Sequence, residues 1–465
     1  MDIRDYFGKK IYFIGIGGSS MSGLAKLMQW HGCEVSGSDR TANHKTDALA
    51  DAGMRVFIGH EGKNVEGSDL VIYSAAIPES NPERMYALEH GIEQIERCTL
   101  IGLLMAHYHN AIAVSGTHGK TTTTAMMAEV FEAAGEDPTI HIGGELPAIG
   151  GSTKLGTGET FICEACEYKG SFWSFLPDQA VITNIDEDHL DFYKDIDDIE
   201  NAFKRFANLV PQEGCVYGCG DDRRVYRLLE SLSCRTCSYG LEPQNVIRAE
   251  DVYFDEMDRA SFTVTYFGHP LVEIELSVPG KHNLLDALAV VAVANNSQLP
   301  MNVVARALHD FKGVQRRYEL TSVTDGVMVY TDYGHNPTET ASVLSVARKQ
   351  AKGRLWAVLQ PHTYSRTKTL FEQFTKCFDD ADEVLVTDIC AAREVDPGDI
   401  NSGMLVDAML ENGVHAHLTP SFDDAEAYLR AHWSKGDSVV TLGCGDIYLL
   451  NEQIAAHGDT QSPEV

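Results

Sequence analysis

The chain has 465 residues, of which 44% are hydrophobic and 23% charged, so it can build the cores of roughly two to four domains. Its formal net charge of −31 disfavours binding to nucleic acid and to anionic membrane surfaces. No stretch reaches the ~18 apolar residues of a membrane helix, the first residues lack a signal-peptide pattern, and eleven cysteines suggest reduced thiols. We therefore expect a cytoplasmic protein that binds neither nucleic acid nor membranes.

The first hundred residues alternate strand-like and helix-like patterns. Residues 11–14 form an apolar strand pattern that runs into the glycine-rich turn 15–20 (GIGGSS), and a helical pattern follows over 19–31. Val35 and residues 70–73 indicate further strands. Such alternation is typical of a parallel sheet with crossover helices.

The turn at residues 15–20, followed by Asp39 about twenty residues later, is open to two interpretations. A dinucleotide-binding turn would need a third glycine, and Ser20 stands in its place. A helix N-terminus that binds some other diphosphate needs only converging N–H groups. We favour the diphosphate over NAD.

A second unit begins near residue 109 with the strand pattern 111–114, the loop 116–121 (GTHGKT) and a helix to about residue 134. Glycines let a loop approach phosphates closely, Lys120 would neutralise the β- and γ-phosphates, and the Thr121 hydroxyl would bind Mg²⁺. Val114 stands where a standard P-loop has its first glycine. The loop nevertheless predicts phosphate binding, because threonines 121–124 offer hydroxyls at the start of the helix.

Acidic groups follow two further strand patterns of this unit. Glu164 follows residues 160–162, and a cluster follows residues 180–183, consisting of Asp186, Asp188, His189 and Asp191. The carboxyl ends of parallel strands meet in one crevice, so these groups predict a Mg²⁺ site beside the phosphate loop.

The rest of the second unit shows hairpin patterns over 246–278 and a helix over 280–295. Two cysteine pairs have CxxC spacing: Cys163 with Cys166, and Cys234 with Cys237. A zinc site is one interpretation, and buried apolar thiols are the one we favour.

A third unit, from about residue 318, has strand patterns at 327–330, 355–359, 384–386 and 438–442, separated by helices. Polar residues 332–337 and 360–366 follow two of these strands, which we take to be adjacent, and Pro337 begins a helix. Two histidines and Arg366 there predict a second anion site. The expected domains are 1–109, 110–317 and 318–465, each α/β with open sheets.

Seven segments, in this order, resemble the signatures of the Mur ligase family between about residues 10 and 450. They are 15–23 with 37–39, 116–123, 183–189, 280–283, 332–335, 360–362 and 391–394. The resemblance implies an N-terminal Rossmann-like domain for a uridine nucleotide sugar, a central P-loop ATPase domain, and a Rossmann-like C-terminal domain. It implies ATP-dependent ligation of L-alanine to the carboxylate of UDP-N-acetylmuramate through an acyl phosphate, in peptidoglycan precursor synthesis. We also expect a monomer or weak homodimer.

The resemblance also implies site residues. The catalytic set is Lys120, Glu164, His189, His335 and Arg366. The ATP set is Gly116, Thr117, His118, Gly119, Lys120, Thr121, Thr122, His282, Asn283, Arg317 and Asp332. The UDP-sugar set is Gly15, Gly17, Gly18, Ser19, Asp39 and Ser74. The Mg²⁺ ligands are Thr121, Glu164 and His189.

Several positions depart from the family pattern. Cys166 replaces an Asp, Asp286 an Asn, Asn336 a second His, and Thr363 an Arg. The last two bear on the amino-acid pocket, which leaves open a Mur-type ligase for another amino acid or a preformed peptide. An NAD-dependent sensor is the remaining alternative, and it would leave Lys120 without a role.

Overall fold

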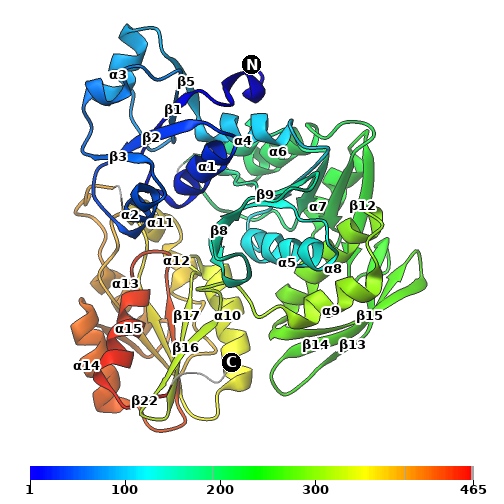
Figure 1. Cartoon of the computed structure of the whole chain (residues 1–465). Coiled ribbons are helices and arrows are strands. Elements are labelled where there is room, and N and C mark those ends of the chain that lie inside the picture. Colours follow the sequence, from blue (N-terminus) through cyan, green and yellow to red (C-terminus); the bar gives the residue numbers. More distant parts are fainter. Residues whose placement is uncertain (191, 393, 462–465) are drawn as a thin grey trace.

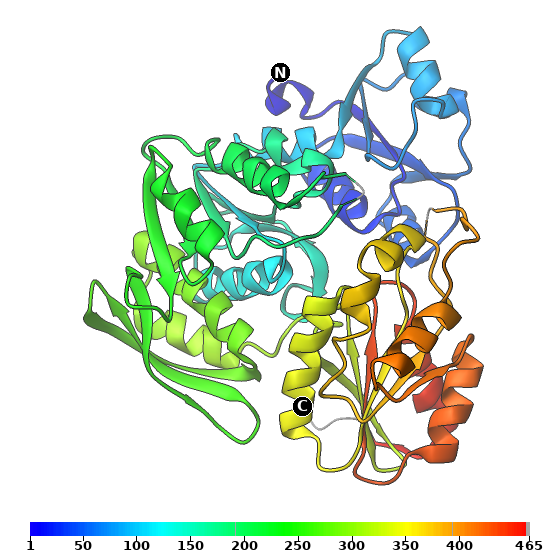
Figure 2. The ribbon, with the colours of Figure 1, turned by 180° about the vertical axis from the view of Figure 1, so that it is seen from behind.

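The computed structural model describes residues 1–190, 192–392 and 394–461. The polypeptide forms three α/β domains, each around its own sheet. Figures 1 and 2 show the N-terminal and C-terminal domains one above the other, both beside the central domain. Two residues of the predicted motifs, Asp191 and Arg393, lie outside the described residues.

The N-terminal domain has a parallel sheet with strand order β3-β2-β1-β4-β5. Its strands are β1 (Lys10–Ile14), β2 (Glu34–Asp39), β3 (Arg55–Ile58), β4 (Leu70–Tyr73) and β5 (Glu93–Glu96). Its helices are η1 (Ile3–Tyr6), α1 (Ser19–Trp30), α2 (His44–Asp51), η2 (Gly62–Val65), α3 (Pro82–Glu89) and α4 (Arg97–Met105). The glycine-rich turn therefore lies between β1 and α1, at the carboxyl edge of the sheet.

The central sheet has the order β15-β14-β13-β12-β11-β10-β6-β9-β7-β8, with parallel strands in its middle. Its strands are β6 (Asn110–Ser115), β7 (Thr139–Leu146), β8 (Gly151–Lys154), β9 (Thr160–Glu164), β10 (Gln179–Ile182), β11 (Cys215–Cys219), β12 (Arg235–Gly240), β13 (Ile247–Phe254), β14 (Arg259–Tyr266) and β15 (His269–Pro279). Its helices are α5 (Lys120–Ala133), η3 (Pro147–Ile149), η4 (Tyr168–Ser174), α6 (Ile196–Ala207), α7 (Arg223–Glu230), α8 (Lys281–Asn296) and α9 (Met301–Asp310).

The C-terminal sheet has the order β20-β19-β18-β21-β17-β16-β22. Its strands are β16 (Glu319–Thr324), β17 (Val327–Asp332), β18 (Leu355–Leu359), β19 (Glu383–Val386), β20 (Ala416–Leu418), β21 (Ser438–Leu442) and β22 (Thr460–Gln461). Its helices are α10 (Pro337–Gln350), α11 (Tyr364–Thr369), α12 (Phe371–Phe374), α13 (Ser402–Glu411), α14 (Phe422–His432) and α15 (Tyr448–His457).

The two boundaries between domains differ in whether a hydrophobic core extends across them. One cluster runs from Phe13 in the N-terminal sheet through Leu104 to Phe161 and Ile182 of the central domain, so these two domains share buried apolar surface. The C-terminal domain has separate clusters on the two faces of its own sheet. Polar interdomain surfaces move more readily than apolar ones, so the C-terminal domain is the one suited to movement.

The predicted fold class, α/β with three domains, is confirmed. One prediction about adjacency is wrong: β21 lies between β17 and β18. The antiparallel hairpin of β7 and β8 was missed, because its second strand has no apolar run. None of the described helices is long and apolar enough to cross a membrane.

Candidate active site

The loop at residues 116–119 joins β6 to the N-terminus of α5, as a phosphate loop requires. Gly119 has a φ of 81°, a left-handed conformation that glycine adopts without strain. A Cβ there would also come within 2.7 Å of Asp286 Oδ1. Both constraints explain why glycine occupies the last position before the helix.

Lys120 lies against its own loop. Its Nζ donates to the carbonyl oxygens of Gly116 at 2.5 Å and Thr117 at 2.9 Å, and it is 3.0 Å from Glu167 Oε2. Burial alone would lower the pKa of Lys120, but the negative groups around it, Glu167 and Glu164 among them, together outweigh burial and raise the pKa above the usual value. Lys120 is therefore a cation at the centre of the loop.

A hydroxyl and a carboxylate meet beside the lysine. Thr121 Oγ1 donates to Glu164 Oε2 at 2.9 Å, and the backbone N–H of Gly143 donates to the same oxygen at 2.9 Å. Hydroxyl and carboxylate oxygens are the ligands that Mg²⁺ prefers. No three His, Cys, Asp or Glu side chains of the described part of the chain could hold a metal by themselves. Phosphate oxygens and water would have to complete the coordination.

Asp286, on α8, lies beneath the loop and is 5% exposed. Its Oδ1 accepts a hydrogen bond from Thr123 Oγ1 at 2.9 Å, and its Oδ2 has no hydrogen-bond partner among the described residues. Burial raises the pKa of this carboxyl to about 7. A titratable group thus lies directly under the phosphate loop.

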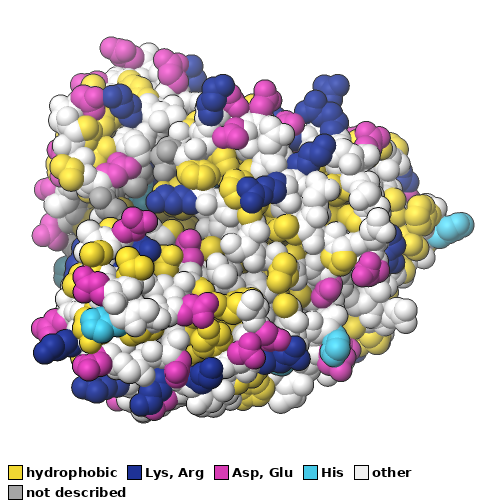
Figure 3. Space-filling view, turned by 90° about the horizontal axis from the view of Figure 1, so that it is seen from above, with side chains coloured by type: hydrophobic (Ala, Val, Ile, Leu, Met, Phe, Trp, Pro, Cys, Tyr) yellow, Lys and Arg dark blue, Asp and Glu magenta, His cyan; other side chains and the backbone are white. Residues whose placement is uncertain are grey.

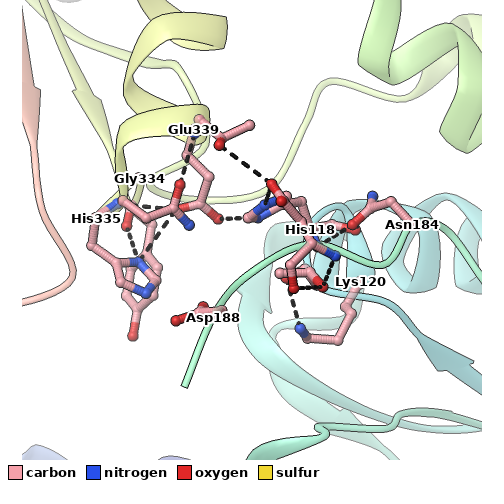
Figure 4. A network of polar contacts seen from close by, with 12 residues as sticks. His118, Lys120, Asn184, Asp188, Gly334, His335 and Glu339 are labelled. Atoms are coloured by element: carbon pink, nitrogen blue, oxygen red, sulfur yellow. Dashed lines mark hydrogen bonds and ion pairs between the residues drawn. The ribbon is translucent and has the colours of Figure 1, made fainter. Parts of the chain in front are cut away.

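The segment after β10 supports the loop from the other side. Asn184 Oδ1 accepts the backbone N–H of His118 at 2.8 Å, and the Thr117 hydroxyl accepts the N–H of Asp186 at 2.9 Å. These bonds fix the two segments against each other, as Figure 4 shows for His118 and Asn184.

Contacts from the C-terminal domain reach the same loop (Figure 4). Glu339 Oε1 lies 3.3 Å from His118 Nδ1, and Asp186 Oδ2 lies 3.4 Å from His118 Nε2. Burial alone would lower the pKa of His118, but its hydrogen bonds to the two carboxylates raise it to about 9. A positively charged ring is thus held between two carboxylates from different domains.

A second interdomain contact joins Arg366 Nη2 to Asp188 Oδ1 at 3.5 Å. Burial would raise the pKa of Asp188, but the charges of His189 and Arg366 lower it to about 2. The rings of His335 and His362 have centroids 6.4 Å apart. The two predicted loops therefore meet although β21 separates their strands.

Small residues after β21 make this meeting possible. A Cβ on Gly443 would lie 3.0 Å from the carbonyl oxygen of Gln360, and one on Gly445 would lie 2.4 Å from Gln360 Oε1. The chain that follows β21 thus passes close behind the loop after β18. We attribute the wrong prediction of adjacency to β21, which is followed by Gly443 and Gly445 and was not recognised as lying between the two strands.

Two other predicted residues, His189 and Asp332, also make defined contacts. His189, with a φ of 53°, is 3.9 Å from Asp188 Oδ2 and 4.0 Å from Glu167 Oε1. Asp332 accepts the backbone N–H groups of Gly334 at 2.6 Å and Tyr318 at 2.7 Å.

The remaining ATP candidates belong to α8 and to the connection before β16. Asn283 Nδ2 donates to the carbonyl of Pro279 at 2.6 Å, while His282 is exposed. The Arg317 guanidinium lies 5.1 Å from the centre of the Tyr333 ring. Thr122 is half-buried on the first turn of α5.

The predicted nucleotide-sugar residues gather where β1, β2 and β4 end. Asp39 Oδ2 accepts the backbone N–H of Gly17 at 2.9 Å, and Lys45 Nζ donates to Ser19 Oγ at 2.7 Å. Gly15 has a φ of 80°, Gly18 caps α1, and Ser74 directly follows β4. Lys45 also lies 3.4 Å from Glu145 of the central domain, which brings a cation to this edge.

Two site residues were missed, Glu167 and Glu339. Glu167 pairs with Lys120, and Glu339 links His118 to His335. Glu167 lies three residues after the predicted ligand Glu164, and this spacing could have pointed to Glu167. For Glu339 the signal was its place on the first turn of a helix that begins at Pro337.

This geometry defines a three-domain α/β protein in which a phosphate loop of the central domain meets a cluster of histidines and arginine from the C-terminal domain. Three protein-family models match consecutive parts of the chain. They are "Mur ligase family, catalytic domain" over residues 10–109, "Mur ligase middle domain" over 114–294, and "Mur ligase, glutamate ligase domain" over 316–445. The chain belongs to the Mur ligase family.

The chain is similar to proteins named UDP-N-acetylmuramate--L-alanine ligase. The one from Clostridium botulinum (strain Okra / Type B1) is 44% identical over 96% of this chain and 97% of its own. The one from Acetivibrio thermocellus is 43% identical over 96% of this chain and 95% of its own. Among solved structures, UDP-N-acetylmuramate-alanine ligase MurC of Thermotoga maritima has a TM-score of 0.81 and 27% identity, covering 96% of this chain and 98% of that one.

Proposed function

We propose that this chain is the ATP-dependent ligase that joins L-alanine to the carboxylate of UDP-N-acetylmuramate, in peptidoglycan precursor synthesis. The observation that carries the proposal is the meeting of the phosphate loop with the His335 and Arg366 cluster across one interface. A ligase of this kind needs a phosphoryl-transfer site and an amine site side by side. The similarity to curated ligases of this name over 96% of the chain supports the substrates.

The ATP phosphates bind at residues 116–122, which are the phosphate loop and the first residues of α5. Lys120 supplies charge, and the loop N–H groups supply hydrogen bonds at the helix N-terminus. The adenosine, and the contacts with ATP that form as the C-terminal domain closes, are assigned to His282, Asn283, Arg317 and Asp332. Thr121 and Glu164, with His189, would hold Mg²⁺, which when bound would neutralise charge on the phosphates.

The nucleotide sugar binds at the carboxyl edge of the N-terminal sheet. Its diphosphate lies over Gly15, Gly17, Gly18 and the start of α1 at Ser19, and Asp39 and Ser74 flank it. The sugar carboxylate then extends toward Lys120. Because the N-terminal and central domains share a hydrophobic core, the distance between these two sites is set by packing.

The reaction has two steps. The muramate carboxylate attacks the γ-phosphorus of ATP, which releases ADP and forms an acyl phosphate. The amine of L-alanine then attacks the acyl carbon and phosphate leaves. Positioning and charge neutralisation are what the first step needs from the protein, and Lys120 provides both. His335 and Arg366 face the incoming amino acid.

Figure 3 shows acidic and basic side chains interspersed over one face, as in many proteins that stay dispersed in water. We place the ligase in the cytoplasm, where its ATP is available. We expect a monomer or a weak homodimer, with no nucleic-acid or membrane partner.

The test is ATP-dependent phosphate release with UDP-N-acetylmuramate and each amino acid in turn. Release with L-alanine, and weaker release with glycine or L-serine, is the expected result. Release with another amine alone would support the proposed mechanism but would assign the enzyme a different amine substrate. No release with any amine would overturn the proposal. Tight NADH binding without ATP binding would instead favour the sensor alternative.

A further inference from the structure

Glu339 is a largely buried carboxylate at the domain interface with no role in the reaction as described so far. Its side chain is 15% exposed, and both oxygens are engaged (Figure 4). Oε1 lies 3.3 Å from His118 Nδ1 of the phosphate loop. Oε2 accepts the backbone N–H of His335 at 3.0 Å and lies 3.4 Å from His335 Nδ1.

A helix-capping role accounts for only one of these oxygens. Glu339 is the third residue of α10, and Asn336 caps that helix by accepting the Glu339 N–H at 2.9 Å. A glutamate at this position commonly reaches back to a backbone N–H at the start of the helix, as Oε2 does here. The contact of Oε1 with another domain adds nothing to the cap. It prevents the carboxylate from rotating away from His335.

The contacts of His335 determine which ring nitrogen carries its hydrogen. Nδ1 lies 3.1 Å from the carbonyl oxygen of Tyr333, and a carbonyl can only accept. Nδ1 is therefore the donor, and Nε2 of the neutral ring carries the lone pair. Burial lowers the pKa of His335 despite the nearby charge of Glu339, so the ring is neutral near pH 7. Asp188 and Arg366 are the other charged groups that act on it.

We propose that Glu339 is a positioning residue that, with the Tyr333 carbonyl, holds His335 as the Nδ1–H tautomer, so that Nε2 accepts a proton from the incoming amino group. The inference rests on the proposed function. It assigns His335 the role of general base in the second step, and it makes the correct orientation of that base depend on the docking of the C-terminal domain onto the phosphate loop through His118.

The proton balance is as follows. The amino acid arrives as an ammonium ion, and Nε2 of His335 takes one proton and frees the lone pair. This pair forms the C–N bond, while the C–O bond to phosphate breaks and its electrons leave with the phosphate. The second proton of the nitrogen leaves with the phosphate. An amine that arrives already unprotonated does not need His335 for this step.

That difference provides the test, with Glu339→Gln and His335→Asn assayed beside the wild type. The glutamine can still accept the His335 N–H and keep the helix cap, but it lacks the charge. Hydroxylamine, which is largely unprotonated at neutral pH, replaces L-alanine as the second amine, and hydroxamate is the product measured. Glu372→Gln is the matched control, since Glu372 is an exposed residue of the same domain that pairs with Lys376 alone among the described contacts.

With L-alanine, we expect kcat of Glu339→Gln and His335→Asn to fall by about tenfold or more, because a positioned base contributes at least that much. With hydroxylamine, both variants should stay within about twofold of the wild type, as should the KM for ATP. Equal losses with both amines would mean a purely structural role and would overturn the inference, as would an unchanged rate with L-alanine. Failure of the wild type with every amine would instead contradict the proposed function.

Discussion

Replacing Asp286 by asparagine tests whether the carboxyl beneath the phosphate loop ionises. Asn is nearly the same size, and its Oδ1 can still accept the Thr123 hydroxyl. The change removes only the possibility of a negative charge in a site that is 5% exposed. Its effect on stability should therefore depend on pH.

The sign follows from proton linkage. Burial raises the pKa of Asp286 from 3.8 to about 7 in the folded protein, so between these values the folded state holds a proton that the unfolded state has lost. Stability contributed by this group falls as pH rises through that window, and the full cost is reached above pH 7. Each pKa unit corresponds to about 1.4 kcal/mol. Between pH 5 and pH 8 the wild type should thus lose about 3 kcal/mol that Asp286→Asn does not lose.

The measurement is calorimetric unfolding of both proteins at pH 5, 6, 7 and 8. The variant should start lower at pH 5, because an unpaired buried amide costs roughly 1–3 kcal/mol. That cost is independent of pH, so the change in the difference between the two proteins isolates the carboxyl. A difference in stability that stays constant from pH 5 to pH 8 would refute the assignment of a protonated Asp286.

Other expected outcomes concern the loop and its neighbours. Lys120→Ala should abolish phosphate release while leaving the circular dichroism spectrum unchanged; a near-normal rate would remove Lys120 from the phosphate site. Chelation with EDTA should stop phosphate release and added Mg²⁺ should restore it, and full activity in EDTA would contradict the roles of Thr121 and Glu164. Arg366→Lys should raise the KM for L-alanine about tenfold, because a charged hydrogen bond contributes roughly 1.5–3 kcal/mol; an unchanged KM would exclude that contact. Gly119→Ala should lower the melting temperature, since a left-handed residue with a Cβ costs on the order of 1–3 kcal/mol, and an unchanged melting temperature would contradict the strain.

The phosphate loop could be predicted from the sequence because its structure depends on residues that lie close together in the chain. Strand β6, the loop and α5 follow directly from an apolar run, glycines and a helical pattern. The parallel pairing of β9 and β10 with β6 then brings Glu164 and the segment after β10 to the same edge. The roles of these residues stay predictions.

Contacts between domains could not be predicted in the same way. The pairing of Glu339 with His118 joins residues 221 positions apart, and no local pattern of charge or periodicity specifies it. The order of strands in the C-terminal sheet was also misjudged, because β21 comes last among the parallel strands in the chain but inserts between earlier ones. Nothing in a strand's own sequence states which neighbours it will take.

The acidic composition of the chain has a direct effect at the site. Each of three cations is already paired within the protein: Lys120 with Glu167 at 3.0 Å, Arg366 with Asp188 at 3.5 Å, and Lys45 with Glu145 at 3.4 Å. An anionic substrate must compete with these carboxylates, so binding exchanges one ion pair for another. The net gain is then smaller than for a free cation, because the separated carboxylate loses its partner. This exchange also favours selectivity, since a ligand with a single weak charge cannot displace Glu167 from a lysine that two loop carbonyls hold in place.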